Sequence, residues 1–203
     1  MKYLKYIAVA GVAFLAFALG LWLFAPWQSA GIYALDFIRL NSARNGVYMN
    51  YDDYESVGVF RPVYQVGKLD IENPFSKVTM SDVTIRVSPL SSLLSGGPVC
   101  HVEFAGADVA FLPNNSLTIG RGSAHLAATG DLIQITDANV EGDLQVTGDI
   151  TYSRGPQRGI RHSTLLLKVP DNINAMLSSP LLSRYVESEN PGEWRIKYAA
   201  ANQ

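Results

Sequence analysis

The chain has 203 residues, a formal net charge of −2, 48% hydrophobic residues and 17% charged residues. This composition excludes disorder throughout the chain, because disorder requires low hydrophobicity and high charge. No run of Lys and Arg exceeds two adjacent residues, which argues against a nucleic-acid-binding protein. The single cysteine, Cys100, excludes an intramolecular disulfide and a multi-cysteine metal site.

The first predicted element is an apolar segment, residues 7–25, in which all 19 side chains are aliphatic, aromatic, Ala or Gly. A helix of this length spans about 28 Å, close to the roughly 30 Å hydrocarbon core of a bilayer. The alternative is a cleaved signal peptide, but its apolar region is shorter, about 7–15 residues, and ends in small residues. We therefore expect an uncleaved anchor. Lys2 and Lys5 precede it, which predicts a cytoplasmic N-terminus.

A helix is expected next, because Pro26 ends the apolar segment and Ser29 can cap a helix that extends through Arg44. Asn45-Gly46 is a typical stop, since Gly accepts the left-handed cap conformation. The expected apolar side of this helix consists of Ile32, Leu35, Phe37, Ile38 and Leu40.

From Gly46 onward the apolar period changes from about 3.6 to 2, which predicts strands with one apolar face and one polar face. The clearest alternation runs over residues 143–152, with Leu144, Val146, Ile150 and Tyr152 on one side. The predicted strands are 46–51, 57–66, 68–72, 78–87, 99–104, 107–112, 116–119, 123–128, 131–140, 143–152, 161–169 and 193–199. Regular Pro and Gly punctuation between them is typical of an antiparallel fold.

Two short helices interrupt the predicted strands. Ser88-Pro89 indicates a helix start and Gly96 its end. Asp171 indicates a second start, and Pro180 divides this helix from a further piece. The apolar residues of the two pieces are Ile173, Met176 and Leu177, then Leu181, Leu182 and Tyr185.

The predicted fold class is mainly β: a single N-terminal transmembrane helix followed by a curved antiparallel β-sheet domain with a few short helices. The predicted division is residues 1–28 for the tail and anchor and residues 29–203 for one exported domain. A sheet with one apolar face has to cover that face with its own helices, by curling, or with a partner or apolar ligand.

Cys100-His101 is the first of three clusters that could carry chemistry. Adjacent side chains of a strand point to opposite faces, so this pair cannot act as nucleophile and base, which must lie within about 3 Å. We expect an inert core cysteine beside an exposed histidine.

The second cluster is acidic and lies among the tyrosines Tyr48, Tyr51 and Tyr54. Its carboxylates belong to Asp52, Asp53 and Glu55. Paired carboxylates can serve a hydrolase or a hard cation, although the spacing does not match an EF-hand. A solvated turn is the main interpretation, and a rim that contacts a partner is the alternative.

The third cluster is the densest positive patch of the exported part and surrounds Gly155-Pro156 and Gly159. Its members are Arg154, Arg158, Arg161 and His162. Arg forms bidentate bonds to carboxylates and lipid phosphates, but a solvated hairpin tip is the main interpretation. GxSxG, HExxH and P-loop motifs are absent from the sequence. We predict no catalytic, cofactor-binding or metal-binding residue, and no enzyme.

The order of these pieces resembles the type II secretion system protein N family of bacterial inner-membrane proteins. The likeness begins with the short tail and anchor and continues with the helix and Gly-Val strand of residues 33–47. It includes VTIRVSPLSSLL at residues 83–94 and EGDLQVTGDI at residues 141–150. It ends with the late strand LLLKVPDNI and its small amphipathic helix.

This resemblance implies a non-catalytic accessory component of the apparatus that exports folded proteins from the periplasm. It implies a single-pass inner-membrane protein with a periplasmic C-terminal domain, other secretion-system envelope proteins as partners, and no cofactor. The family is also similar to AsmA and lipopolysaccharide-bridge proteins, whose curved sheets hold acyl chains. The alternative function is therefore a periplasmic module that binds or transfers phospholipid or lipopolysaccharide. In that alternative the apolar channel is lined by Leu144, Val146, Ile150, Leu165 and Leu167.

Overall fold

The structure is a computed structural model that describes residues 12–14, 16, 17, 20, 26–44, 46–58, 62–111, 115–156, 158–179 and 185–196. The expected anchor, residues 7–25, lies mostly outside these ranges. Within them, no helix combines the length and the hydropathy that a membrane span requires.

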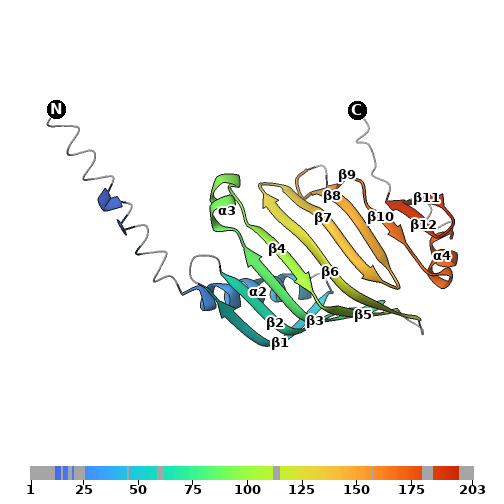
Figure 1. Cartoon of the computed structure of the whole chain (residues 1–203), viewed down its shortest axis with the longest axis horizontal. Coiled ribbons are helices and arrows are strands. Elements are labelled where there is room, and N and C mark those ends of the chain that lie inside the picture. Colours follow the sequence, from blue (N-terminus) through green and yellow to red (C-terminus); the bar gives the residue numbers. More distant parts are fainter. Residues whose placement is uncertain are drawn as a thin grey trace.

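The described part of the chain is built around one 12-stranded antiparallel sheet (Figure 1). Its strands are β1 (Tyr48–Val57), β2 (Val63–Asn73), β3 (Ser76–Val87), β4 (Val99–Phe104), β5 (Gly106–Phe111), β6 (Asn115–Thr129), β7 (Leu132–Gly142), β8 (Gln145–Ser153), β9 (Gly159–Ser163), β10 (Leu166–Lys168), β11 (Val186–Asn190) and β12 (Glu193–Ile196). Their order is β1-β2-β3-β4-β6-β7-β8-β10-β12-β11. The short β5 lies between β3 and β6 beside the end of β4, and β9 pairs with β8. The predicted mainly β, antiparallel fold is confirmed.

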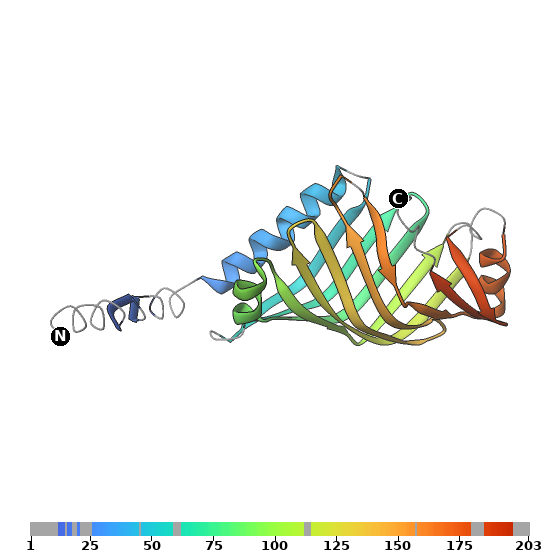
Figure 2. The same cartoon turned by 90° about the horizontal axis from the view of Figure 1, so that it is seen from above.

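A crease crosses β1, β2 and β3 at Asp53, Gly67 and Asp82, which lie opposite one another. Regular strand pairing is interrupted at these three residues, but the register is the same on both sides of them. Asp53 and Asp82 adopt left-handed backbone, with φ of 55° and 50°. Alternation of side chains between the two faces reverses there, so Tyr51 and Tyr54, three residues apart, lie on the same face. Ala105 continues the crease as the break between β4 and β5. Figure 2 shows the curvature of the sheet.

One face of the sheet is apolar and the other is polar, as the period of 2 predicts. One apolar row joins Met49, Ile71, Val78, Val109 and Leu117 across five strands. One polar row joins Glu55, Gln65, Thr84, Glu103, Ser123, Asn139 and Thr147.

Helix α2 (Trp27–Ala43) packs on the apolar face at the β1 edge, behind β1 to β3 in Figure 1. Gly31 is its buried residue, and a Cβ there would meet the side chains of Tyr54 and Tyr64. Tyr51 Oη donates to Asp36 Oδ1 at 3.2 Å, and Tyr54 Oη donates to the Gln28 carbonyl at 3.1 Å. The helix is therefore seated by a glycine and by polar contacts.

The expected apolar side of this helix is wrong as a packing face. Phe37, Ile38 and Leu40 are 68%, 49% and 61% exposed, and Leu35 is half-buried. The contact needs a small residue, Gly31, beneath the tyrosine rings. The expected start is also wrong: the helix begins at Trp27 with Pro26 at its N-cap, and Ser29 lies inside it.

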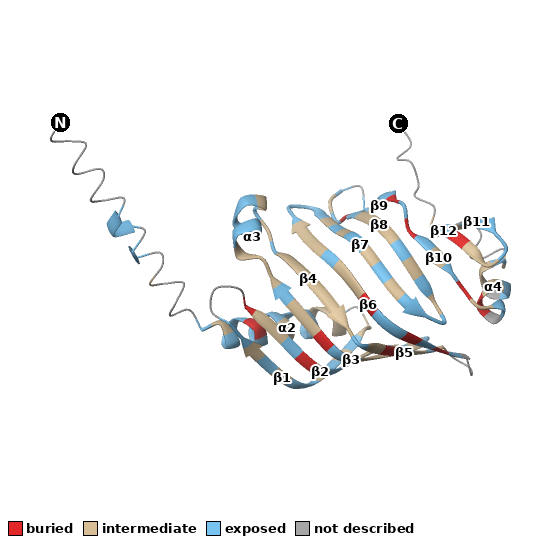
Figure 3. Cartoon of the chain, viewed as in Figure 1, coloured by how far each residue is buried: buried red, intermediate tan, exposed pale blue. Residues whose placement is uncertain are grey.

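Among the described residues, buried apolar side chains are few and lie outside the middle strands β4, β7 and β8 (Figure 3). Val66 and Val83 are 1% and 2% exposed on the α2 side of the sheet. A second cluster, centred on Trp194, includes α4 (Asp171–Leu177), and Trp194 Nε1 donates to Asn174 Oδ1 at 2.8 Å. Its buried members are Leu117, Val169, Ile173 and Trp194.

Several predicted strand boundaries need correction. The predicted strand 57–66 is wrong, because β1 continues to Val57 and the next strand begins only at Val63. Residues 116–119 and 123–128 belong to the single strand β6, and residues 161–169 are divided between β9 and β10. The predicted strand 99–104 is confirmed as β4. β11 was not predicted, and the helical piece after Pro180 lies mostly outside the described residues.

Both short helices are confirmed. Helix α3 spans Pro89–Ser95 with Pro in its first turn, and Gly96 closes it with a φ of 69°. Ser88 occupies the N-cap position without a side-chain capping bond. Helix α4 begins at Asp171 as expected.

Candidate interaction surface

In the middle of the apolar face, the described elements leave a row of apolar side chains only half-buried. We call it the open apolar face. Cross-strand pairs such as Leu126–Ile135 and Ile135–Ile150 place its side chains on the same side as Val66. Its members are Val102, Phe104, Ala124, Leu126, Ile133, Ile135, Val140, Val146 and Ile150, all half-buried. Among the described helices, none lies over β6, β7 or β8 (Figures 1 and 2).

A continuous apolar surface of this kind marks a site for another protein or for an apolar ligand, because exposed apolar area is unfavourable in water. The predicted channel residues are divided between this surface and the core. Val146 and Ile150 belong to the open apolar face. Leu165 is buried, and Leu144 and Leu167 pack against the Trp194 cluster.

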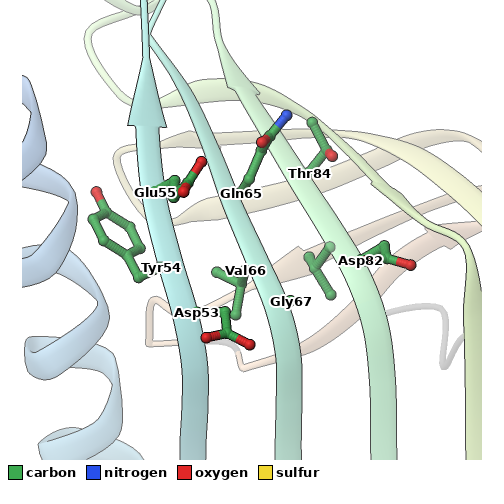
Figure 4. A pocket seen from close by; sticks show the side chains of 9 residues that line it. Asp53, Tyr54, Glu55, Gln65, Val66, Gly67, Asp82 and Thr84 are labelled. Atoms are coloured by element: carbon green, nitrogen blue, oxygen red, sulfur yellow. The ribbon is translucent and has the colours of Figure 1, made fainter.

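The polar face carries a cavity of about 530 Å³ at the crease, over β1, β2 and β3 (Figure 4). Carboxylates of Asp53, Glu55 and Asp82 line it, together with Gln65 and Thr84. These side chains do not form a metal centre: the described residues contain no group of three or more His, Cys, Asp or Glu that could hold an ion.

The structure separates the acidic cluster from its tyrosines. Asp52, Asp53 and Glu55 lie within β1, so the expected solvated turn is wrong. Figure 4 shows Tyr54 directed toward α2 and Glu55 directed away from it. Burial, together with Tyr64 and Tyr51, raises the pKa of Tyr54 to about 12. The tyrosines therefore hold the helix rather than serve the carboxylates.

Cys100 and His101 occupy successive positions of β4 and point to opposite faces, as predicted. Cys100 is half-buried on the apolar side, and burial raises the pKa of its thiol. His101 therefore cannot act as a base for Cys100.

His101 is half-buried rather than exposed, which corrects the expectation. Its Nε2 lies 3.0 Å from Glu103 Oε1, and its ring lies 4.3 Å from that of His125. Arg86 pairs with the same Glu103 carboxylate at 2.6 Å and, with His101, holds the pKa of Glu103 below its usual value. These contacts tie β3, β4 and β6 together on the polar face.

Of the arginine patch, Arg154 and Arg158 lie at the hairpin tip between β8 and β9, as the main interpretation expected, whereas Arg161 and His162 lie within β9. Arg154 Nη2 donates to the Gly130 carbonyl at 2.7 Å, which joins this tip to the β6–β7 turn. Arg158 and Arg161 are exposed. The patch therefore has one structural arginine and two that face solvent.

Sequence reasoning missed an exposed apolar patch on α3. Leu90, Leu93 and Leu94 are 71%, 79% and 81% exposed. Their spacing of three and four residues, which places side chains on one helix face, was the available signal.

A family model described as type II secretion system protein GspN-like, Synergistales, matches residues 4–198 of the chain. No curated protein and no solved structure matches it. The family match covers the apolar N-terminal segment and every described strand.

Proposed function

The chain belongs to the type II secretion system GspN-like family, and we propose that it is a non-catalytic accessory component of that system. Residues 1–28 form the cytoplasmic tail and inner-membrane anchor, and residues 29–203 form the periplasmic domain. The apolar run of residues 7–25 and the preceding Lys2 and Lys5 support this topology.

The open apolar face carries the proposal that the domain acts by docking other envelope components of the secretion system. Contact between this apolar surface and water is unfavourable, so burying it against a partner would lower the free energy. The outer edges of β1 and β11 end the sheet in the described chain, and their backbone groups offer strand addition as a second mode of contact.

The clusters that could carry chemistry support a non-catalytic role. Cys100 and His101 are on opposite faces, and the carboxylates of β1 face away from Tyr54. Glu103 is engaged with Arg86 and His101 in joining strands.

Site-specific photocrosslinking in cells tests the docking surface. A benzoylphenylalanine residue at Ile135, on the open apolar face, is compared with one at its neighbour Gln134, which is exposed on the polar face of the same strand. We expect crosslinks from position 135 to another secretion-system envelope protein and none from position 134. Equal crosslinking at both positions, or none at 135, would overturn the proposal.

The alternative, a lipid-binding or lipid-transfer module, is favoured by the same surface because Val146, Ile150 and their neighbours offer only hydrocarbon side chains. The photocrosslinking experiment separates the two functions. A lipid module would transfer the label at Ile135 to phospholipid or lipopolysaccharide, which mass spectrometry of the purified protein would identify.

A further inference from the structure

Helix α3 presents three leucines to solvent on one side. Leu90, Leu93 and Leu94 are each at least 71% exposed. Residues 88–98, which include the helix and its flanks, contain no charged side chain. An exposed apolar patch of this kind is typical of a segment that contacts an apolar surface.

The inner side of α3 is polar and firmly bonded. Ser92 Oγ donates to the Ser88 carbonyl at 2.8 Å and accepts the Val99 N–H at 2.8 Å. Ser95 Oγ donates to the Gly97 carbonyl at 3.0 Å. The helix therefore holds Ser92 and Ser95 inward and its leucines outward, the reverse of the pattern of a helix that packs on its own core.

The position of α3 relates this patch to the N-terminal segment. α3 and the first turn of α2 lie at the same end of the molecule in both views (Figures 1 and 2). α2 begins at Trp27, directly after the apolar residues 7–25. The β2–β3 turn, with Phe75, lies at the opposite end of those strands, because α3 follows the far end of β3.

The arginine tip lies at the same end of the strands as α3. Val99 of β4 pairs with Ala127, and the β6–β7 turn brings Leu132 opposite Ser153, directly before Arg154. Exposed arginines at the same end of the sheet as a leucine patch suit a lipid surface, since guanidinium groups bind phosphate.

We infer that α3 inserts Leu90, Leu93 and Leu94 into the surface of the bilayer that holds the N-terminal anchor. This second contact fixes the orientation of the sheet relative to the membrane. The inference rests on the anchor in the proposed function. It identifies the partner of α3 as lipid because the segment lacks charge and lies at the same end of the molecule as the first turn of α2.

Spin labelling of the full chain in vesicles of phosphatidylethanolamine and phosphatidylglycerol tests this inference. Cys100 is first replaced with Ala, and single labels are attached at Leu93→Cys, Phe75→Cys and Phe17→Cys. Phe75 is the matched control, because it is 79% exposed, as Leu93 is, at the opposite end of its strands. The ratio of oxygen to nickel-chelate accessibility reports whether each label lies in lipid.

We expect the ratio at position 93 to be severalfold higher than at position 75, and the label at position 17 to lie in lipid. Lipid at position 17 with water at position 93 would overturn the contact of α3 and leave the anchor intact. Water at position 17 would overturn the anchor and the inference together. Shielding of position 93 only after secretion-system proteins are added would identify a protein partner and overturn the inference.

A variant with Leu93→Asp and Leu94→Asp is a second measurement. Both residues are exposed, so the circular dichroism spectrum should be unchanged. A label at Leu90→Cys should then move from lipid to water while a label at Phe17→Cys stays in lipid. A Leu90 label that stays in lipid would show that these leucines do not carry the contact.

Discussion

Two regions of the same apolar sheet face differ in what covers them. On the α2 side of the sheet, Val66 of β2 and Val83 of β3 are almost completely buried. On β7 and β8, Ile135, Val146 and Ile150 point to the same side and are only half-buried. The side chains are of the same kind, so the difference lies in the covering element and not in the strands.

The difference shows that period-2 alternation identifies a face and does not identify its cover. α2 achieves close contact through Gly31 and the rings of Tyr54 and Tyr64, which stack with centroids 6.1 Å apart. The described strands β6 to β8 have no such helix, and their apolar side chains stay available to another molecule. The first region is a core, and the second has the properties of a binding surface.

The largest expected loss of stability comes from a substitution that disturbs the contact between α2 and the sheet. Gly31→Leu should lower the free energy of unfolding by about 2–3 kcal/mol, because the new side chain overlaps Tyr54 and Tyr64 and this overpacking exceeds the gain in helix propensity. Ala34→Leu, at an exposed position of the same helix, is the control and should change stability by less than about 0.5 kcal/mol. Urea unfolding measures both. Equal losses of stability in the two variants would contradict the close packing of α2 at Gly31.

Matched valine truncations compare the two regions directly. Val66→Ala should cost about 2 kcal/mol, because Val66 is 1% exposed and its neighbours cannot collapse fully into the space. Val146→Ala, on the open apolar face, should cost less than about 1 kcal/mol because part of the valine already contacts water. Urea unfolding measures the free energy of unfolding of both variants. A larger loss at Val146 would show that the open region is a packed core.

Because Tyr54 contacts α2, we predict that this region loses stability at alkaline pH and that the open apolar face does not. The pKa of Tyr54 is raised to about 12, so its neutral form, which donates to the Gln28 carbonyl, is stabilised by folding. This contribution is fully present below the ordinary pKa of about 10 and is lost as the pH rises through 12. Tyr54→Phe should cost about 1 kcal/mol at pH near 8, and the difference from the unsubstituted chain should narrow above pH near 10.

Absorbance at 295 nm provides an independent check of this alkaline dependence. The titration curve of Tyr54→Phe should lack one late tyrosine that the unsubstituted chain shows. A difference in stability that stays constant across this pH range would contradict the assigned role of Tyr54.

The sequence predicted the fold class, the antiparallel strands and both short helices because each depends on local pattern. It also indicated the family, through the order of the elements, and the family match confirms that resemblance. It divided β2 and β6 wrongly for a physical reason. At the crease, the row that contains Gly67 reverses which face each side chain meets, and a reversal of period is indistinguishable in sequence from the end of a strand.

The contact sites were harder to predict than the strands. The acidic residues of β1 suggested a turn because charge is uncommon within strands, yet one face of β1 is polar and accommodates Asp52 and Glu55. The sequence did not indicate that Gly31 is the contact residue of the helix, since its role depends on Tyr54 and Tyr64, which only the fold brings near. The outward stripe of α2 was read as a packing face because apolar spacing does not state what it faces.

The smallest expected effect lies on the polar face, behind the open region, where Glu103 bonds to Arg86 and His101. These partners lower the pKa of Glu103, so its contribution to stability is present above the ordinary glutamate pKa of about 4.3 and is lost as the pH falls through the lower folded value. Glu103→Gln should cost less than about 1 kcal/mol near neutral pH, because both ion-pair partners are partly exposed. Acid unfolding should show the variant and the unsubstituted chain converging below pH near 4.

The control for this prediction is Glu141→Gln, which removes the pairing of Glu141 with Arg121, an arginine that is 77% exposed. Both substitutions delete one carboxylate from the polar face, so a shared effect of net charge would appear in both. Glu103 differs because its carboxylate joins β3 to β4 and also contacts the histidine that stacks on His125 of β6. A loss of stability confined to Glu103→Gln would therefore measure how far these polar contacts hold β3, β4 and β6 together.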